Sequence, residues 1–278
     1  MARKRSRKSK RKTRRLRRQR GGDIPLSYNA PGEIKVFVSA DKMKPTLEAL
    51  LTSLKKHNYS YEVLGMGKPW KGFKTKMENY LDGIKRYVAE KGPYAVGIFV
   101  DAFDVLCIKD SAKVIASYKE KPRPMPIVVG TEIVCFYTEN CSLDALDWYD
   151  HNNIPGGSKA IKESFTKPEP ERPYYKTPTS VFLNSGFIMG SAEELRALFQ
   201  GMMDSGDTDD QLAVIHYMKK NMDKIDYDIE EAMIRNKLDP RTKLPDEDGT
   251  QGPGFIHFPG SRTDDEQKKA LEYYAAYA

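Results

Sequence analysis

The sequence predicts an α/β fold in which a mostly parallel central sheet is flanked by helices. Over residues 34–100, short runs rich in β-branched and aromatic residues alternate with segments of helical apolar spacing, in the order strand, helix, strand, helix, strand. The third of these runs, residues 95–100, has no polar side chain, which is typical of a strand covered on both faces. With 278 residues, 39% of them hydrophobic, the chain is long enough to bury a substantial core.

The expected elements follow one another along the chain. In the first part they are strand 34–38, helix 43–57, strand 61–64, helix 74–89 and strand 95–100. In the second part they are helix 111–118, one or two strands within 126–136, a strand from 181 into 184–190, a helix from 191, a helix from 208 to about 221 and a strand at 254–258. Capping-box pairs mark two of these helices, Ser191 with Glu194 and Thr208 with Gln211. Residues 152–179, with five prolines and two adjacent glycines, predict an excursion over the surface.

Two acids follow the buried strand, at the end where open α/β sheets gather ligands. Asp101 and Asp104 stand there on one tight turn, and no Lys or Arg follows them before Lys109. Two hard oxygen donors so placed suit a magnesium or manganese ion that bridges to a phosphate. The alternative is that both acids only cap a turn or begin the next helix.

Two further places hold candidate site residues. Asp209 and Asp210 lie in an acidic cluster at the expected start of a helix, where the helix dipole favours acids by about 0.3 to 1 kcal/mol each. These two acids therefore either stabilise the N-terminus of the helix or take part in catalysis. His257 is delivered by an apolar strand into a Gly/Pro turn, and it is either a metal ligand or a structural histidine.

Charge divides the chain into a basic tail and an acidic body. The first 20 residues hold 13 Lys or Arg and no acid, whereas the rest of the chain has 33 basic and 39 acidic residues. Residues 1–22 are expected to be a disordered basic tail and residues 23–33 a linker. The tail predicts non-specific polyanion binding, a nuclear address or attachment to an anionic surface, unless it is only a solvated extension.

Targeting features point to an intracellular protein. The N-terminus lacks the apolar segment of a secretory signal, and no apolar run approaches the roughly 20 residues that would span a membrane. The three cysteines, Cys107, Cys135 and Cys141, show no C-x-x-C spacing and fit buried thiols in a reducing compartment.

Taken in order, these motifs resemble the glycosyltransferase domain of procollagen lysyl hydroxylases and related collagen glycosyltransferases. The resemblance runs from about residue 34 to residue 260. It rests on Trp70, Lys76, the segment 99–106 with its two acids, the segment Leu183-Asn184-Ser185-Gly186-Phe187-Ile188-Met189-Gly190, the cluster Asp207-Thr208-Asp209-Asp210-Gln211 and Ile256-His257.

The resemblance implies a GT-A type fold that binds a UDP-sugar and Mn2+ (or Mg2+). Asp101, Asp104 and His257 match the metal ligands of the family, and Asp209 and Asp210 match its acids near the transferred sugar. The residues that it implies at the donor are Trp70, Lys76, Phe103, Asn184, Ser185, Gly186, Gly260 and Arg262.

The sequence also departs from the family. Phe103 stands where the family usually has Tyr, so one hydroxyl contact to the donor is lost. After His257 the family's glycine-rich motif carries a lysine that meets the diphosphate, and Arg262 is the expected substitute. No histidine is followed by x-Asp, so the iron site of the hydroxylase half is absent. Freestanding domains with basic tails resemble proteins of large DNA viruses.

The predicted function is a metal-dependent glycosyltransferase, with residues 34–263 as the domain and 264–278 as a C-terminal helix. It would move a hexose from a UDP-sugar to a protein or glycan hydroxyl, and the resemblance implies hydroxylysine of a collagen-like protein. Its expected location is the cytoplasm or nucleus of a host cell, or the virion if it is viral. Two alternatives remain: a nucleic-acid-associated protein acting through its tail, and a metal-dependent nucleotidyltransferase or phosphohydrolase.

Overall fold

The computed structural model describes residues 26–29, 34–121, 127–132, 134–135, 148–152, 175–176, 180, 182–236 and 252–259. The basic tail 1–22, Gly260, Arg262, most of the excursion 152–179 and the helix expected at 264–278 lie outside these residues, so what the sequence predicts for them stays a prediction. Within the described part no helix is long and apolar enough to cross a membrane.

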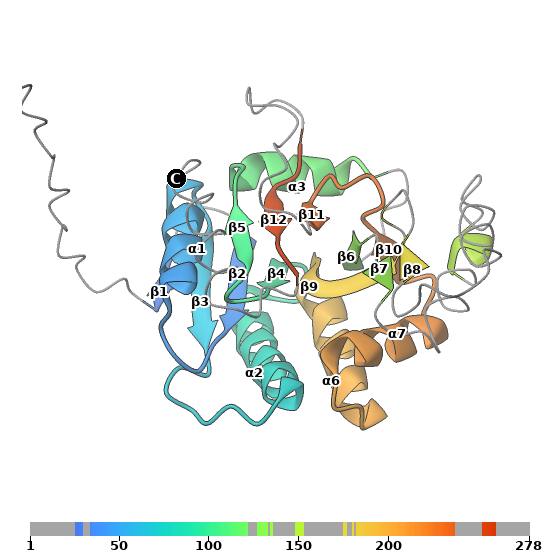
Figure 1. Cartoon of the computed structure of the whole chain (residues 1–278), viewed down its shortest axis with the longest axis horizontal. Helices are drawn as coiled ribbons and strands as arrows, with labels where there is room; N and C mark the ends of the chain where they lie inside the picture. Colours follow the sequence, from blue (N-terminus) through green and yellow to red (C-terminus); the bar gives the residue numbers. More distant parts are fainter. Residues whose placement is uncertain are drawn as a thin grey trace, which may run out of the picture.

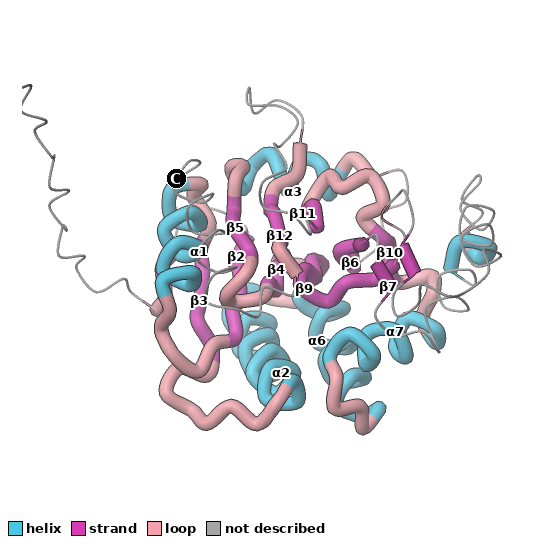
Figure 2. Tube along the Cα trace, viewed as in Figure 1, coloured by secondary structure: helices cyan, strands magenta, loops and turns pink. Residues whose placement is uncertain are grey.

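The centre of the molecule is a seven-stranded mixed sheet (Figures 1 and 2). In spatial order its strands are β1 (Ser27–Tyr28), β3 (Ser60–Leu64), β2 (Ile34–Ser39), β4 (Val96–Val100), β9 (Phe182–Ser191), β6 (Ile127–Glu132) and β10 (Ile225–Tyr227). Part of the expected linker thus forms β1, which pairs with β3.

The prediction of a mostly parallel sheet was wrong. Strand β9 lies between β4 and β6 and runs antiparallel to both, and β1 is antiparallel to β3, so only three of the six strand pairs are parallel. The physical reason is that β9 is buried along almost its whole length. A strand covered on both faces has an apolar sequence whichever way it runs, so composition does not reveal its direction.

Two layers cover the sheet. On one face lie α2 (Phe73–Lys91), α6 (Ala192–Ser205) and α7 (Asp210–Lys220). On the other lie α1 (Pro45–Lys56), α3 (Ser111–Lys119) and a small sheet in the order β11 (Ile234–Asn236), β12 (Phe255–His257) and β5 (Val105–Cys107). Strand β2 alternates between these cores, since Phe37 packs in the first and Val36 and Val38 in the second. A separate pair joins β7 (Val134–Cys135) to β8 (Tyr175–Lys176).

The order of the predicted elements is confirmed where the structure describes them. The helix expected at 74–89 is α2, extended by one residue at its start and two at its end, and the buried run 95–100 is β4. Cys107 is free and buried, as expected. Ser191 is the N-cap of α6, but its side chain makes no capping hydrogen bond.

The carboxyl ends of β2, β4 and β6 meet at one edge of the sheet. Strand β9 enters the sheet at the same edge, because its register sets Asn184 beside Gly130 of β6 and Phe187 beside Val100 of β4. The backbone N–H of Asp101 donates to the carbonyl of Gly186 at 3.1 Å. All the site residues that the structure describes come from this edge or from elements packed over it.

Candidate metal and donor site

The pairing of β12 with β5 brings His257 to the two acids of the turn after β4. In the antiparallel register His257 lies opposite Val105, directly after Asp104, and the N–H of Phe258 donates to the carbonyl of Asp104 at 2.8 Å. His257 Nε2 lies 3.6 Å from Asp101 Oδ2 and 3.5 Å from Asp104 Oδ1. One potential ligand atom from each of the three residues falls within 4.8 Å of the others.

His257 is buried with one ring nitrogen unsatisfied. Its side chain is 2% exposed, and its Nε2 makes no hydrogen bond among the described residues. Burial alone would lower the pKa of His257, but the carboxylates of Asp104 and Asp101, with a smaller contribution from Glu132, raise it. One imidazole nitrogen facing two partly buried carboxylates is a donor set that can hold a divalent metal ion.

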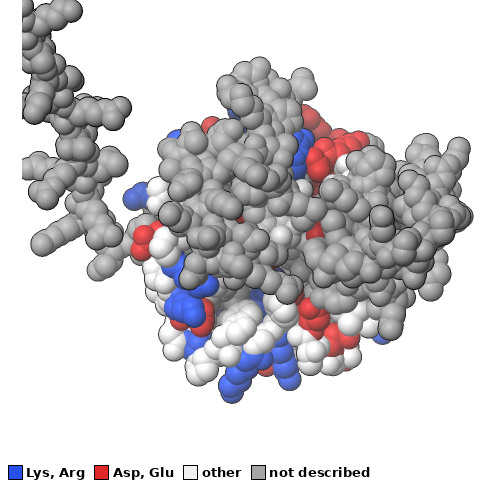
Figure 3. Space-filling model, viewed as in Figure 1, with Lys and Arg blue, Asp and Glu red and all other residues white. Residues whose placement is uncertain are grey.

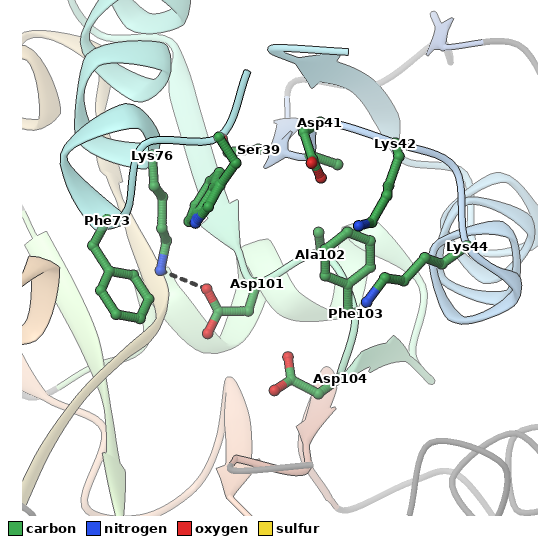
Figure 4. A pocket seen from close by; sticks show the side chains of 12 residues that line it. Ser39, Asp41, Lys42, Lys44, Phe73, Lys76, Asp101, Ala102, Phe103 and Asp104 are labelled. Carbon is green, nitrogen blue, oxygen red and sulfur yellow. Dashed lines mark hydrogen bonds and ion pairs between the residues drawn. The ribbon is translucent and has the colours of Figure 1, made fainter. Parts of the chain in front are cut away.

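Lys76 links the acids after β4 to the acids of α7. It lies in the first turn of α2, and its Nζ is 2.5 Å from Asp101 Oδ1 (Figure 4). The same Nζ is 2.5 Å from Asp210 Oδ2. Burial would lower the pKa of Lys76, but Asp101 and Asp210 raise it well above its usual value. Lys76 is therefore a buried, charged lysine held between two carboxylates.

The two acids at the start of α7 have different partners in the structure. Asp209 is the N-cap, and its carboxylate accepts from the backbone N–H of Leu212 at 3.0 Å. The expected cap at Thr208 is therefore one residue too early, because the carboxylate of Asp209 occupies the capping position instead. Asp210 is 4% exposed and faces Lys76, so of the two it is the one joined to the site.

Asn184, Ser185 and Gly186 lie in the buried part of β9, under the metal candidates. Asn184 Oδ1 accepts from the N–H of Gly186 at 2.8 Å, and the N–H of Ser185 donates to Gln211 Oε1 at 3.3 Å. A Cβ at Gly186 would lie 2.3 Å from Cε1 of His257. These hydrogen bonds are thus made within the protein. Because Gly186 has no side chain, the imidazole of His257 has space beside it.

A cavity of about 560 Å3 opens above Asp101 and Asp104. Its walls include two aromatic residues that the sequence points to, Trp70 and Phe103, and one that it misses, Phe73. Phe73 and Phe103 are drawn in Figure 4. Lys44 Nζ lies 4.3 Å from the centre of the Phe103 ring. A cavity of this size with acids at its floor and aromatic walls suits a small charged ligand with a flat group.

The sequence analysis also misses three polar residues of the cavity, Asp41, Lys42 and Lys44. They follow directly after β2, and the end of a parallel strand is the signal that could have found them. On the face drawn in Figure 3, Lys and Arg gather over the part of the body that holds α1 and α2, and Asp and Glu lie toward α6 and α7. The cavity thus has Lys42 and Lys44 on its α1 side, and its Lys76 is ion-paired with Asp210 at the start of α7.

Residues 30–144 match the family model described as the PLOD GT domain. This match covers less than half of the chain and supports a glycosyltransferase. The matched stretch carries Trp70, Lys76, Asp101, Phe103 and Asp104, whereas α7 and His257 lie beyond it.

Two known proteins resemble this glycosyltransferase domain. The multifunctional procollagen lysine hydroxylase and glycosyltransferase of Caenorhabditis elegans is 26% identical over 188 residues, 65% of this chain. The aligned region is 22% of that relative's length. A glycosyltransferase involved in the glycosylation of the major capsid of PBCV-1 shares the fold, with a TM-score of 0.50 at 10% identity over 86% of this chain and 98% of that one. These likenesses confirm the glycosyltransferase type of α/β fold.

Proposed function

We propose that this chain is a metal-dependent glycosyltransferase that moves a hexose from a UDP-sugar to an acceptor hydroxyl. The observation that carries the proposal is the cluster of Asp101, Asp104 and His257, whose Nε2 makes no hydrogen bond among the described residues. The two acids of this cluster also line an aromatic-walled cavity. The match to a glycosyltransferase family model supports the reaction class.

Transfer of the sugar requires the negative charge on the departing diphosphate to be stabilised. A divalent ion held by Asp101, Asp104 and His257 would act as a Lewis acid on that diphosphate. Lys76 adds a buried positive charge beside Asp101. In this proposal Trp70 and Phe103 provide the flat apolar surface against which the uracil packs.

Asp210 is the group that we assign to the acceptor. It is ion-paired with Lys76, and in this proposal its carboxylate accepts the hydrogen bond of an attacking hydroxyl or takes its proton. Asp209 is occupied by the N–H of Leu212 and is assigned to the helix instead.

Hydroxylysine in a collagen-like peptide is the acceptor to test first. The Caenorhabditis elegans relative is named as a procollagen lysine hydroxylase and glycosyltransferase, and the similarity to it extends over 188 residues of this chain. The structural neighbour is named for glycosylation of a capsid, so a viral coat protein or its glycan is the second acceptor class.

The test is turnover of a panel of UDP-sugars with a hydroxylysine peptide, in Mn2+ and then in excess chelator. Product should form only with the metal, and Asp104→Asn should reduce it by roughly 100-fold or more. The matched control is Asp82→Asn, which removes the same charge from the exposed face of α2 and should leave turnover unchanged. Full turnover in chelator, or in Asp104→Asn, would refute the metal assignment.

A further inference from the structure

Asn236 is a buried amide that contacts the candidate metal histidine from a different strand. Strand β11 runs parallel to β12, and the register sets Asn236 directly beside His257. Asn236 Oδ1 lies 2.6 Å from His257 Nδ1, and the two residues are 8% and 2% exposed. This contact is therefore shielded from solvent, where a hydrogen bond is electrostatically stronger and its loss leaves an unpaired buried group.

The other end of the amide fixes which way it points. Asn236 Nδ2 donates to the backbone carbonyl of Thr131 at 2.5 Å. Because a carbonyl can only accept, this end must be the NH2 group, and the oxygen must face His257. An oxygen opposite Nδ1 requires the proton to be on Nδ1, so the neutral ring has its free lone pair on Nε2.

The backbone of β9 fixes the plane of the same ring. A Cβ on Gly186 would lie 2.3 Å from Cε1 and 2.6 Å from Nδ1 of His257, and 2.9 Å from Asn184 Oδ1. The imidazole is thus packed against bare backbone on one side and hydrogen-bonded by Asn236 on another. These two contacts restrict rotation of the ring, and its Nε2 lies 3.6 Å from Asp101 Oδ2 and 3.5 Å from Asp104 Oδ1.

We propose that Asn236 is a positioning residue, which selects the Nδ1–H tautomer of His257 and keeps Nε2 aimed at a divalent cation shared with Asp101 and Asp104. The inference rests on the metal site of the proposed function, but not on the sugar or the acceptor. Partners that orient a metal-bound histidine typically change metal affinity by about 10- to 100-fold when they are removed. The effect of Asn236 should fall in this range.

The experiment measures Mn2+ binding to the full chain by the electron paramagnetic resonance signal of free Mn2+, without any nucleotide. Asn236→Leu removes the acceptor at similar volume and should weaken binding by about 10- to 100-fold. Asn236→Asp keeps an oxygen opposite Nδ1 but loses the donor to the carbonyl of Thr131, so it should weaken binding less than Asn236→Leu does. The matched control, Asn152→Leu, removes a buried amide that donates to the carbonyl of Trp148, and should not change Mn2+ binding.

The outcomes separate the inference from the function on which it rests. If Asn236→Leu is folded by circular dichroism and binds Mn2+ as tightly as the wild type, the positioning role is refuted while the metal site stands. If Asn236→Asp loses as much affinity as Asn236→Leu, the acceptor role of the amide oxygen is refuted, and this comparison decides the matter even if Asn236→Leu does not fold. If the wild type binds no Mn2+, the metal part of the proposed function falls, and the inference falls with it.

Discussion

Glu132 should make the stability of the protein fall as pH rises toward neutrality. It ends β6, is 1% exposed, and accepts from Gln211 Nε2 at 3.2 Å, while its Oε2 makes no hydrogen bond among the described residues. Burial raises the pKa of the Glu132 carboxyl to about 7, although hydrogen bonds from Asn184 and Gln211 and the nearby His257 act in the opposite direction.

The direction and size of the pH effect on the free energy of unfolding follow from this pKa. Between the ordinary glutamate value of 4.5 and about 7, the folded chain holds a proton that the unfolded chain has released. The contribution of Glu132 to stability is therefore complete below pH 4.5 and is lost as pH rises through 7. A shift of about 2.5 pKa units at 1.36 kcal/mol per unit corresponds to about 3 kcal/mol in full.

Glu132→Gln keeps the shape and removes the proton linkage. Urea unfolding of the metal-free protein at pH 5, 6, 7 and 8 should show the wild type losing on the order of 2 to 3 kcal/mol relative to the variant across that range. Glu90→Gln, at an exposed position of α2, is the control and should run parallel to the wild type. Parallel curves for the wild type and Glu132→Gln would refute the argument from burial.

Three further predictions concern the site. Lys76→Met leaves the carboxylates of Asp101 and Asp210 without their cation, so the free energy of unfolding should fall by about 3 kcal/mol or more in urea titrations, and an unchanged value would contradict the ion pairing. Asp209→Ala should cost about 1 kcal/mol through loss of the cap with turnover retained, whereas Asp210→Asn should lower turnover by roughly 100-fold; melting curves and rates that show the reverse would exchange the two assignments. Trp70→Ala removes a 43% exposed ring, so calorimetry should show UDP binding weakened about 10-fold or more with little change in melting temperature, and undiminished binding would exclude stacking there.

The sequence predicts well those parts of the fold that depend on burial. The run 95–100 is apolar because β4 is covered on both faces, and the leucines between 43 and 57 recur at helical spacing because one side of α1 packs on the sheet. The direction of β9 could not be predicted, since burial leaves the same apolar pattern in a parallel and an antiparallel strand. Adjacent polar residues compete for the N-cap position of a helix. The sequence pattern therefore predicts Thr208 as the cap, whereas Asp209 caps α7.

The site residues also differ in whether the sequence can predict them. Asp101 and Asp104 are predictable because a buried strand ends at them, and His257 comes from the resemblance to a family. The pairing of Lys76 with Asp210 joins residues 134 positions apart, and only the packing of α2 on α7 brings them together. Asn236 carries no signal of its own in the sequence, because its role depends on the register of β11 beside β12.

The most direct test of the account is the anomalous diffraction of manganese in crystals grown with Mn2+ and UDP. The account predicts one strong peak at about 2 Å from a carboxylate oxygen of Asp101, a carboxylate oxygen of Asp104 and Nε2 of His257, with the diphosphate on its open side. UDP bound in the cavity with no peak at these three residues, or with the peak elsewhere, would contradict it.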